Sequence, residues 1–192
     1  MNLYDDLEKF KKNIALVYEN QTFTYENILN NSKSLSKNIN NKSLIFLLSD
    51  NDYESIISIV SSFFSNSVLM LLNTNIHKKS LDNLINLYKP DYIFLKKKIK
   101  LKIDKFYNKT EFHNYVILEA KNPLKKNINP ELFLLQSTSG STGSPKNVRI
   151  SYENLNTNTN SIIKDLNINE NDVTITTLPM NYVYGLSIIN TH

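Results

Sequence analysis

The amino-acid sequence predicts an α/β protein with a largely parallel sheet flanked by helices, and two patterns carry this prediction. Short apolar runs without polar alternation occupy residues 43–49, 68–73 and 91–95, as expected of strands buried on both faces. Segments with apolar residues at helical spacing separate these runs, and the connections are short. The 192 residues suffice for one domain with a sizeable core, or for part of a larger domain.

The first part of the chain shows a turn signal and two helix-start signals. Asn20-Gln21 lies between two strand-like runs and predicts a short hairpin. Thr24 is a candidate N-cap for the first helix, and Asp50-Asn51-Asp52 can cap the second. The elements expected here are hairpin strands over 14–19 and 22–25, a helix over 25–40, a strand over 43–49, a helix ending near residue 65 and a strand over 68–73.

The second part continues the alternation. Ser80 and Ser151 are candidate N-caps, and Pro90 is expected to stop the helix that precedes it. The elements expected here are a helix over 81–89, strands over 91–95, 115–119, 132–136 and 173–178, and a helix over 152–166.

Composition and charge exclude several functions. The net charge is +4, but the one dense basic run, Lys96 to Lys105, interleaves lysines with Ile99, Leu101 and Ile103. This pattern favours an exposed hairpin or edge strand with its apolar residues facing inward, so we expect no nucleic-acid partner. The chain has no cysteine, and its three histidines lie far apart in sequence, so we expect no metal site built from them.

Neither a signal peptide nor a membrane span is expected. The first ten residues carry three acids, and the most apolar stretch, residues 56–72, is shorter than a spanning helix and contains five serines. A helix followed by a buried strand fits this stretch better. These observations predict a cytoplasmic protein.

The segment STSGSTGSPK, residues 137–146, carries the strongest functional signal. Two of the three glycines, Gly140 and Gly143, lie in it, directly after a predicted buried strand. Glycines let backbone N–H groups converge on an anion, and a turn beyond a strand's carboxyl end is where open α/β sheets bind ligands. Hydroxyl groups and the Lys146 ammonium add donors suited to a triphosphate. A polar linker would explain the small residues, but not the strand before them or the lysine.

This segment is not a Walker A loop, because Gly143 is followed by Ser-Pro-Lys. It resembles the phosphate-binding segment of the adenylate-forming superfamily, [ST]-S-G-[ST]-T-G-x-P-K-G. The superfamily includes acyl-CoA synthetases, acyl-AMP ligases and peptide-synthetase adenylation domains. Asn147 replaces the final glycine, and asparagine tolerates left-handed backbone angles better than most residues. The matching positions are Thr138, Ser139, Gly140, Ser141, Thr142, Gly143, Pro145 and Lys146. Except for Pro145, the resemblance implies that these residues bind the phosphates of ATP.

Weaker similarities to the same superfamily lie elsewhere in the chain. TFTYENI resembles an early T-Y-x-E-L segment, and VLMLLNTN resembles a strand that ends in P-L-N, without the proline. TLPMNYVYGLS resembles the P-[LM]-x-H-x-x-G-L segment that begins the wall of the acyl pocket, with Tyr182 in place of the common histidine. The resemblance therefore implies that Tyr182 and Gly185 line this pocket.

Other motifs of the superfamily are absent before His192: the adenine-binding strand, Y-G-x-[ST]-E, the ribose aspartate and the C-terminal domain with its catalytic lysine. We therefore expect residues 1–192 to form an incomplete N-terminal portion of the large domain, inactive alone, and we assign no catalytic or metal-binding residue.

For the intact enzyme, the resemblance implies that ATP, Mg²⁺ and a small carboxylic acid yield an acyl-adenylate. Transfer to coenzyme A, a carrier-protein thiol or an amine would follow. The alternatives are a non-catalytic remnant and an unrelated phosphate-binding α/β module. The coding sequence downstream of His192 would discriminate between a split enzyme and a remnant.

Overall fold

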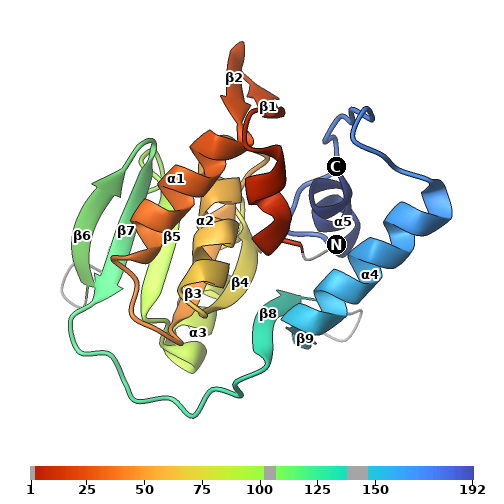
Figure 1. Ribbon diagram of the computed structural model, residues 1–192. Helices are drawn as coiled ribbons and strands as arrows, with labels where there is room; N and C mark the ends of the chain where they lie inside the picture. The colour runs from red at the N-terminus through yellow and green to blue at the C-terminus, as the bar shows by residue number, and fades with distance from the viewer. Residues whose placement is uncertain (1–2, 102–106, 138–146) are drawn as a thin grey trace.

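The computed structural model describes residues 3–101, 107–137 and 147–192. Within these residues a seven-stranded sheet carries helices on both faces, and a two-stranded hairpin projects from one end (Figure 1). In chain order the elements are the 3-10 helix η1 (Asp5–Phe10), β1 (Ile14–Tyr18), β2 (Gln21–Thr24), α1 (Tyr25–Ser36), β3 (Leu44–Ser49), α2 (Tyr53–Phe64), β4 (Val68–Asn73), α3 (Lys78–Tyr88), β5 (Tyr92–Lys96), β6 (Tyr107–Phe112), β7 (Tyr115–Ala120), β8 (Leu132–Ser137), β9 (Asn147–Ser151), α4 (Tyr152–Leu166) and α5 (Val183–Thr191).

The sheet has a parallel centre and antiparallel edges. Its strand order is β6-β7-β5-β3-β4-β8-β9, and the four central strands β5, β3, β4 and β8 are mutually parallel. The pairs β5–β7, β6–β7 and β8–β9 are antiparallel. The predicted parallel sheet is thus confirmed for the centre. The β6–β7 edge reverses direction because only two residues connect these strands, which is too short for a parallel crossover.

Strand β3 lies between two hydrophobic clusters, one on each face of the sheet. Ile45 and Leu47 pack into the cluster that contains buried residues of α1 and α2. Phe46 and Leu48 pack into the other cluster, with Leu81 of α3. Figure 1 shows α1 and α2 in front of the sheet and α3 behind it. The absence of polar alternation in residues 43–49 therefore has its expected cause, since both faces are covered.

Most predicted helix starts are confirmed by side-chain caps. The Thr24 hydroxyl accepts from the Asn27 amide, while the Asn27 side chain accepts from the Thr24 amide, which makes a capping box at α1. Asp52 caps α2, and Ser151 caps α4. The prediction that Ser80 caps the third helix is wrong, because α3 begins one turn earlier. There the His77 ring, which is its N-cap, accepts from the Lys79 amide.

The largest difference from the sequence prediction concerns residues 173–178, which form no strand. The alternating pattern V-T-I-T-T-L is typical of a strand, but no described strand forms a ladder with it. A strand needs backbone partners, and without them the apolar side chains stay in solvent. Val173 is 95% exposed and Ile175 is 79% exposed. The predicted first helix is also four residues too long, because α1 ends at Ser36.

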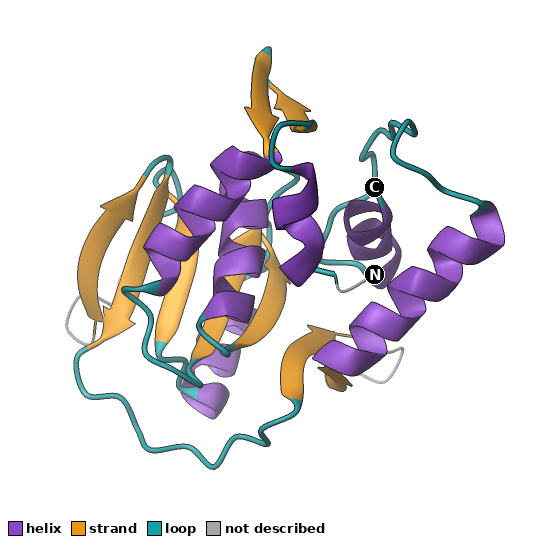
Figure 2. Cartoon of the chain, in the orientation of Figure 1, coloured by secondary structure: helices purple, strands orange, loops and turns teal. Residues whose placement is uncertain are grey.

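Residues 96–101 follow the predicted basic hairpin only in part. Lys96 ends β5, the next residues form a turn, and Ile99 and Leu101 pack against the second hydrophobic cluster, as predicted. Ile103 lies outside the described residues. Strand β6 and helices η1 and α5 were not predicted. The chain from β7 to β8 is a long loop without regular structure (Figure 2). No helix in the described ranges is long and apolar enough to cross a membrane.

Leu47 offers a direct test of the doubly covered sheet. Its side chain is fully buried at the centre of β3. We expect Leu47→Ala to lower the free energy of unfolding by about 2–5 kcal/mol, because the substitution leaves a cavity between two packed layers. Urea denaturation followed by circular dichroism measures this change. Leu87→Ala is the matched control, since Leu87 is 74% exposed on α3 and should change stability by less than about 0.5 kcal/mol. Equal effects of the two substitutions would contradict the assigned core.

Candidate functional site

The candidate site lies at the edge of the sheet where the parallel strands end. Ser49, Asn73, Lys96 and Ser137 are the last residues of β3, β4, β5 and β8, and parallel pairing places all four at this edge. The Ser49 hydroxyl donates to the Leu72 carbonyl at 3.3 Å, which joins the ends of β3 and β4. In open α/β sheets the carboxyl edge is the ligand-binding edge. The turns beyond these strands are therefore the first place to look for a site.

The predicted phosphate loop, residues 138–146, lies outside the described residues, but both of its ends are described. Ser137 pairs with Asn147 across the antiparallel ladder of β8 and β9, so the loop connects two adjacent strands. Asn147 belongs to β9, and its side-chain amide donates to the Tyr88 hydroxyl of α3 at 2.8 Å. This residue therefore extends the strand and anchors the loop exit, and it needs no left-handed backbone. The contact gives a reason for asparagine at this position that sequence reasoning missed.

The predicted acyl-pocket residues lie at the start of α5. Tyr182 is the N-cap of α5 and is 55% exposed, and its amide donates to the Pro179 carbonyl at 3.0 Å. Gly185 is buried on the face of α5 toward this turn. A Cβ at Gly185 would lie 2.3 Å from the Pro179 carbonyl oxygen and 2.9 Å from that of Leu178. The helix can approach the preceding turn this closely only because position 185 has no side chain.

Helix α5 is attached to the rest of the chain through the first hydrophobic cluster. Met180 is fully buried and Leu186 nearly so, and both belong to this cluster. The Tyr4 hydroxyl donates to the Asn190 side-chain oxygen at 3.1 Å. At the start of the same segment, the Gln136 side-chain amide donates to the Asn181 carbonyl. Because Gln136 lies two residues before the phosphate loop, this contact connects the two predicted parts of the site.

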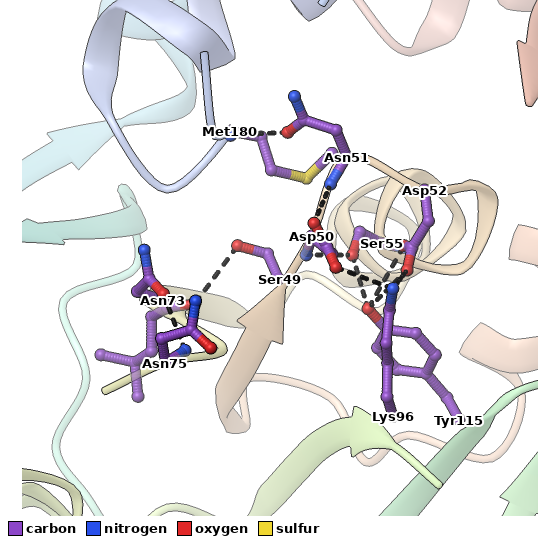
Figure 3. A network of polar contacts seen from close by, with 11 residues as sticks. Ser49, Asp50, Asn51, Asp52, Ser55, Asn73, Asn75, Lys96, Tyr115 and Met180 are labelled. Carbon is purple, nitrogen blue, oxygen red and sulfur yellow. Dashed lines mark hydrogen bonds and ion pairs between the residues drawn. The ribbon is translucent and has the colours of Figure 1, made fainter. Parts of the chain in front are cut away.

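A polar network follows β3 and fixes the loop that leads into α2 (Figure 3). The Lys96 ammonium lies 2.8 Å from an Asp50 carboxylate oxygen and 2.9 Å from an Asp52 oxygen. Asp52 is 1% exposed, and it also accepts from the Ser55 amide at 2.9 Å and from the Tyr115 hydroxyl at 3.2 Å. The lysine thus ties the carboxyl ends of β3 and β5 together, and the buried Asp52 has a donor on each side.

The protonation states of this network follow from burial and charge. The hydrogen bond from Lys96 lowers the pKa of Asp50. Burial acts to lower the pKa of Lys96, but hydrogen bonds to both aspartates outweigh it and raise that pKa above its ordinary value. Burial raises the pKa of Tyr115, and the Asp52 charge raises it further. The Tyr115 hydroxyl therefore stays protonated, and it donates a hydrogen bond to the Asp52 carboxylate. The Ser55 hydroxyl, 2.7 Å away, donates in turn to the Tyr115 oxygen.

Between α2 and α5, Asn51 makes three hydrogen bonds to the backbone of residues 176–180. Its side-chain nitrogen donates to the Thr176 and Leu178 carbonyls at 3.1 and 2.9 Å. Its side-chain oxygen accepts from the Met180 amide at 3.0 Å. The sequence analysis treated Asn51 only as part of a helix cap. No sequence signal could place it against a segment 125 residues away.

The described residues contain no group of three or more His, Cys, Asp or Glu side chains placed to hold a metal ion. Two of the three histidines contribute to helix capping or ring packing. The His77 ring caps α3, and the His113 ring packs edge-on against Tyr53 and Phe112. His192 is the last residue.

The fold is that of an α/β domain in which four parallel strands end at one edge of the sheet. The profile of the AMP-binding enzyme family matches residues 3–192, so the chain belongs to that family. A curated relative is the 2-succinylbenzoate–CoA ligase of Staphylococcus epidermidis, which is 24% identical over 179 residues. The match covers 92% of this chain and 37% of the ligase, so the chain spans well under half of this relative.

Solved structures show the same fold. The o-succinylbenzoate CoA synthetase of Bacillus subtilis in complex with an acyl-adenylate intermediate superposes with a TM-score of 0.76 at 20% identity, over 99% of this chain and 52% of that one. The same synthetase in complex with ATP and magnesium gives 0.76 at 19% identity, over 100% and 54%. Apo MatB of Rhodopseudomonas palustris gives 0.77 at 16% identity, over 99% and 42%.

Gly185 provides a test of the close contact at α5. We expect Gly185→Ala to lower the free energy of unfolding by about 1–3 kcal/mol, because the new methyl group would overlap backbone atoms that cannot rotate away. Differential scanning calorimetry measures the loss. Ser187→Ala in the same helix is the control, since its hydroxyl bonds only within α5. If both variants melt together, the close contact is not made in solution.

Lys96 provides a test of the polar network. We expect Lys96→Met to cost about 1–3 kcal/mol, because it leaves the buried Asp52 without its cation. The pKa of Asp50 is lowered in the folded chain, so this contribution is present above the ordinary carboxyl pKa and is lost as the pH falls through the folded pKa. The unfolding free energy of the wild type should therefore fall more steeply below about pH 4 than that of the variant.

Urea denaturation at several pH values between 2 and 7 measures this difference. Lys97→Met is the control, because Lys97 pairs with Glu111 on the exposed surface and should change stability by less than about 1 kcal/mol. Parallel pH profiles for the wild type and Lys96→Met would show that the ion pairs do not contribute to stability.

Proposed function

We propose that this chain is the N-terminal part of an AMP-forming acid–thiol ligase. The complete enzyme, meaning this chain together with the rest of its domain and the C-terminal domain, activates a small carboxylic acid with ATP. It then transfers the acyl group to coenzyme A or a carrier-protein thiol. The observation that carries the proposal is the family match over residues 3–192, which includes the phosphate-loop sequence held between β8 and β9. The ligase names of the relatives support the acid and the thiol as substrates.

The first reaction forms one bond and breaks another. A carboxylate oxygen of the acid attacks the α-phosphorus of ATP, and pyrophosphate leaves with the electron pair of the cleaved P–O bond. Negative charge grows on the bridging and terminal phosphate oxygens during this step. Backbone amides and hydroxyls of residues 138–144 and the Lys146 ammonium are the groups of this chain suited to stabilise that charge.

The ends of the phosphate-loop segment support its place in the site, because Ser137 and Asn147 pair at the carboxyl edge of the sheet, where ligands bind in open α/β sheets. Among the described residues, no group of three or more acidic or histidine side chains is placed to hold magnesium. Magnesium would enter with the ATP phosphates and offset their charge. No residue described here is assigned as its ligand.

The segment from Pro179 to Gly185 supports a role in acid selection. It contacts Gln136 at the end of β8, so it lies beside the strand that leads into the phosphate loop. Tyr182 is exposed at the start of α5, where a substrate can reach it. At Gly185, by contrast, the backbone of the preceding turn occupies the space that a side chain would need. We therefore propose that Tyr182 contacts the acid directly. Gly185 sets the position of α5.

Lys146 is the residue that tests the proposal. In the complete enzyme we expect Lys146→Ala to slow adenylate formation by roughly 10- to 150-fold, because a charge-assisted contact contributes about 1.5–3 kcal/mol. ATP–pyrophosphate exchange measures this step. The second step, started from supplied acyl-adenylate, should stay near the wild-type rate because pyrophosphate has already left.

Lys33→Ala is the matched control, since Lys33 pairs with Glu8 on the exposed surface of α1. It should change neither step. Adenylate formation at the wild-type rate in Lys146→Ala would refute the phosphate role. So would an equal loss in both steps together with a large fall in melting temperature.

A further inference from the structure

The contacts of Asn51 suggest a role beyond capping. We call the three hydrogen bonds from its side chain to Thr176, Leu178 and Met180 the Asn51 clamp. They use both hydrogens of the amide group and its oxygen, at distances of 2.9–3.1 Å. Figure 3 shows the Asn51 side chain directed at the Met180 backbone. Among the common side chains of this size, only an amide supplies two donors and an acceptor together.

The clamp is rigid on the Asn51 side. Both neighbours of Asn51 in the chain are bonded to the Lys96 ammonium, and Asp52 is also bonded to Tyr115 and to the first turn of α2. Moving Asn51 would therefore disturb a buried ion pair. A half-satisfied buried network is costly, so the loop that carries Asn51 has a strong reason to stay in place.

Within residues 3–101, 107–137 and 147–192, few other polar contacts hold the clamped segment. Residues 173–178 form no strand ladder, and Val173 and Ile175 are exposed. The segment becomes buried only at Met180, and its next polar tie is the contact between the Gln136 side chain and the Asn181 carbonyl. The path of residues 176–181 is therefore set from two strand ends, with Asn51 beyond β3 and Gln136 on β8.

We propose that Asn51 is a positioning residue for the acid pocket. It fixes the backbone of residues 176–180 and, through it, the place of Tyr182 relative to the carboxyl ends of β3 and β8. Asn51 itself need not touch either substrate. The assignment of the pocket rests on the function proposed above, whereas the clamp itself can be tested without any activity.

The clamp is tested by amide hydrogen exchange, resolved by residue, in the 192-residue chain. In Asn51→Ala we expect the Met180 amide to exchange roughly 2- to 10-fold faster, the factor expected for the loss of one net hydrogen bond. Asn51→Asp keeps an acceptor for that amide but turns an oxygen toward the Thr176 and Leu178 carbonyls. It should leave Met180 closer to the wild type than Asn51→Ala does. If Asn51→Ala does not fold, Asn51→Leu, which fills the same space without an acceptor for the Met180 amide, replaces it.

Asn31→Ala is the matched control. Asn31 also donates from its side-chain amide, to the Tyr53 hydroxyl, and it has no hydrogen bond to the described residues 176–180. Its substitution should leave Met180 exchange unchanged. Unaltered exchange in both Asn51 variants, or equal acceleration in the Asn31 control, would overturn the clamp.

The pocket role is tested in the complete enzyme. We expect Asn51→Ala to raise the KM for the acid several-fold more than the KM for ATP, because the displaced segment is proposed to contact only the acid. Equal changes in both constants, or none, would overturn the positioning role even where the exchange result supports the clamp. A wild-type enzyme that forms no adenylate with any acid would instead contradict the proposed function, and the exchange experiment would still decide the clamp.

Discussion

The burial of β3 on both faces is the constraint on which the rest of the structure depends. Its side chains alternate between two hydrophobic clusters, so α1 and α2 must cover one face and α3 the other. Parallel pairing with β4 and β5 then brings three strand ends to one edge. A doubly covered parallel strand leaves its carboxyl end as the natural place for polar chemistry, because the backbone emerges there from the core into turns.

The polar network after β3 connects the packed core to the candidate site and fixes the loop between them. Burying Asp52 would be costly without partners, and Lys96, Tyr115 and the first turn of α2 supply them. These partners come from three different elements, so the loop after β3 is fixed relative to all of them. Asn51 lies within that loop, and its hydrogen bonds fix the backbone of the segment that precedes α5. The packing of the core therefore determines the geometry of the candidate site.

Residues 173–178 show how much a strand depends on its partners. The alternating sequence has strand character, but a strand is stabilised by a ladder and by packing of one face, and neither is present for this segment among the described residues. Its order comes instead from side chains at the ends of β3 and β8. The chain spans about half the length of these two solved relatives.

The sequence by itself determined the local elements and the family. Apolar runs identified β3, β4, β5 and β8, cap residues located the starts of α1, α2 and α4, and the loop motif indicated phosphate binding, because these signals depend only on neighbouring residues. Tertiary structure decided what joins distant positions. The pairing of Lys96 with Asp52 and the Asn51 clamp depend on contacts across 44 or more residues, and periodicity and propensity hold no information about such pairings. The antiparallel pairing of β7 with β5 likewise depends on which strand lies beside it in the folded sheet.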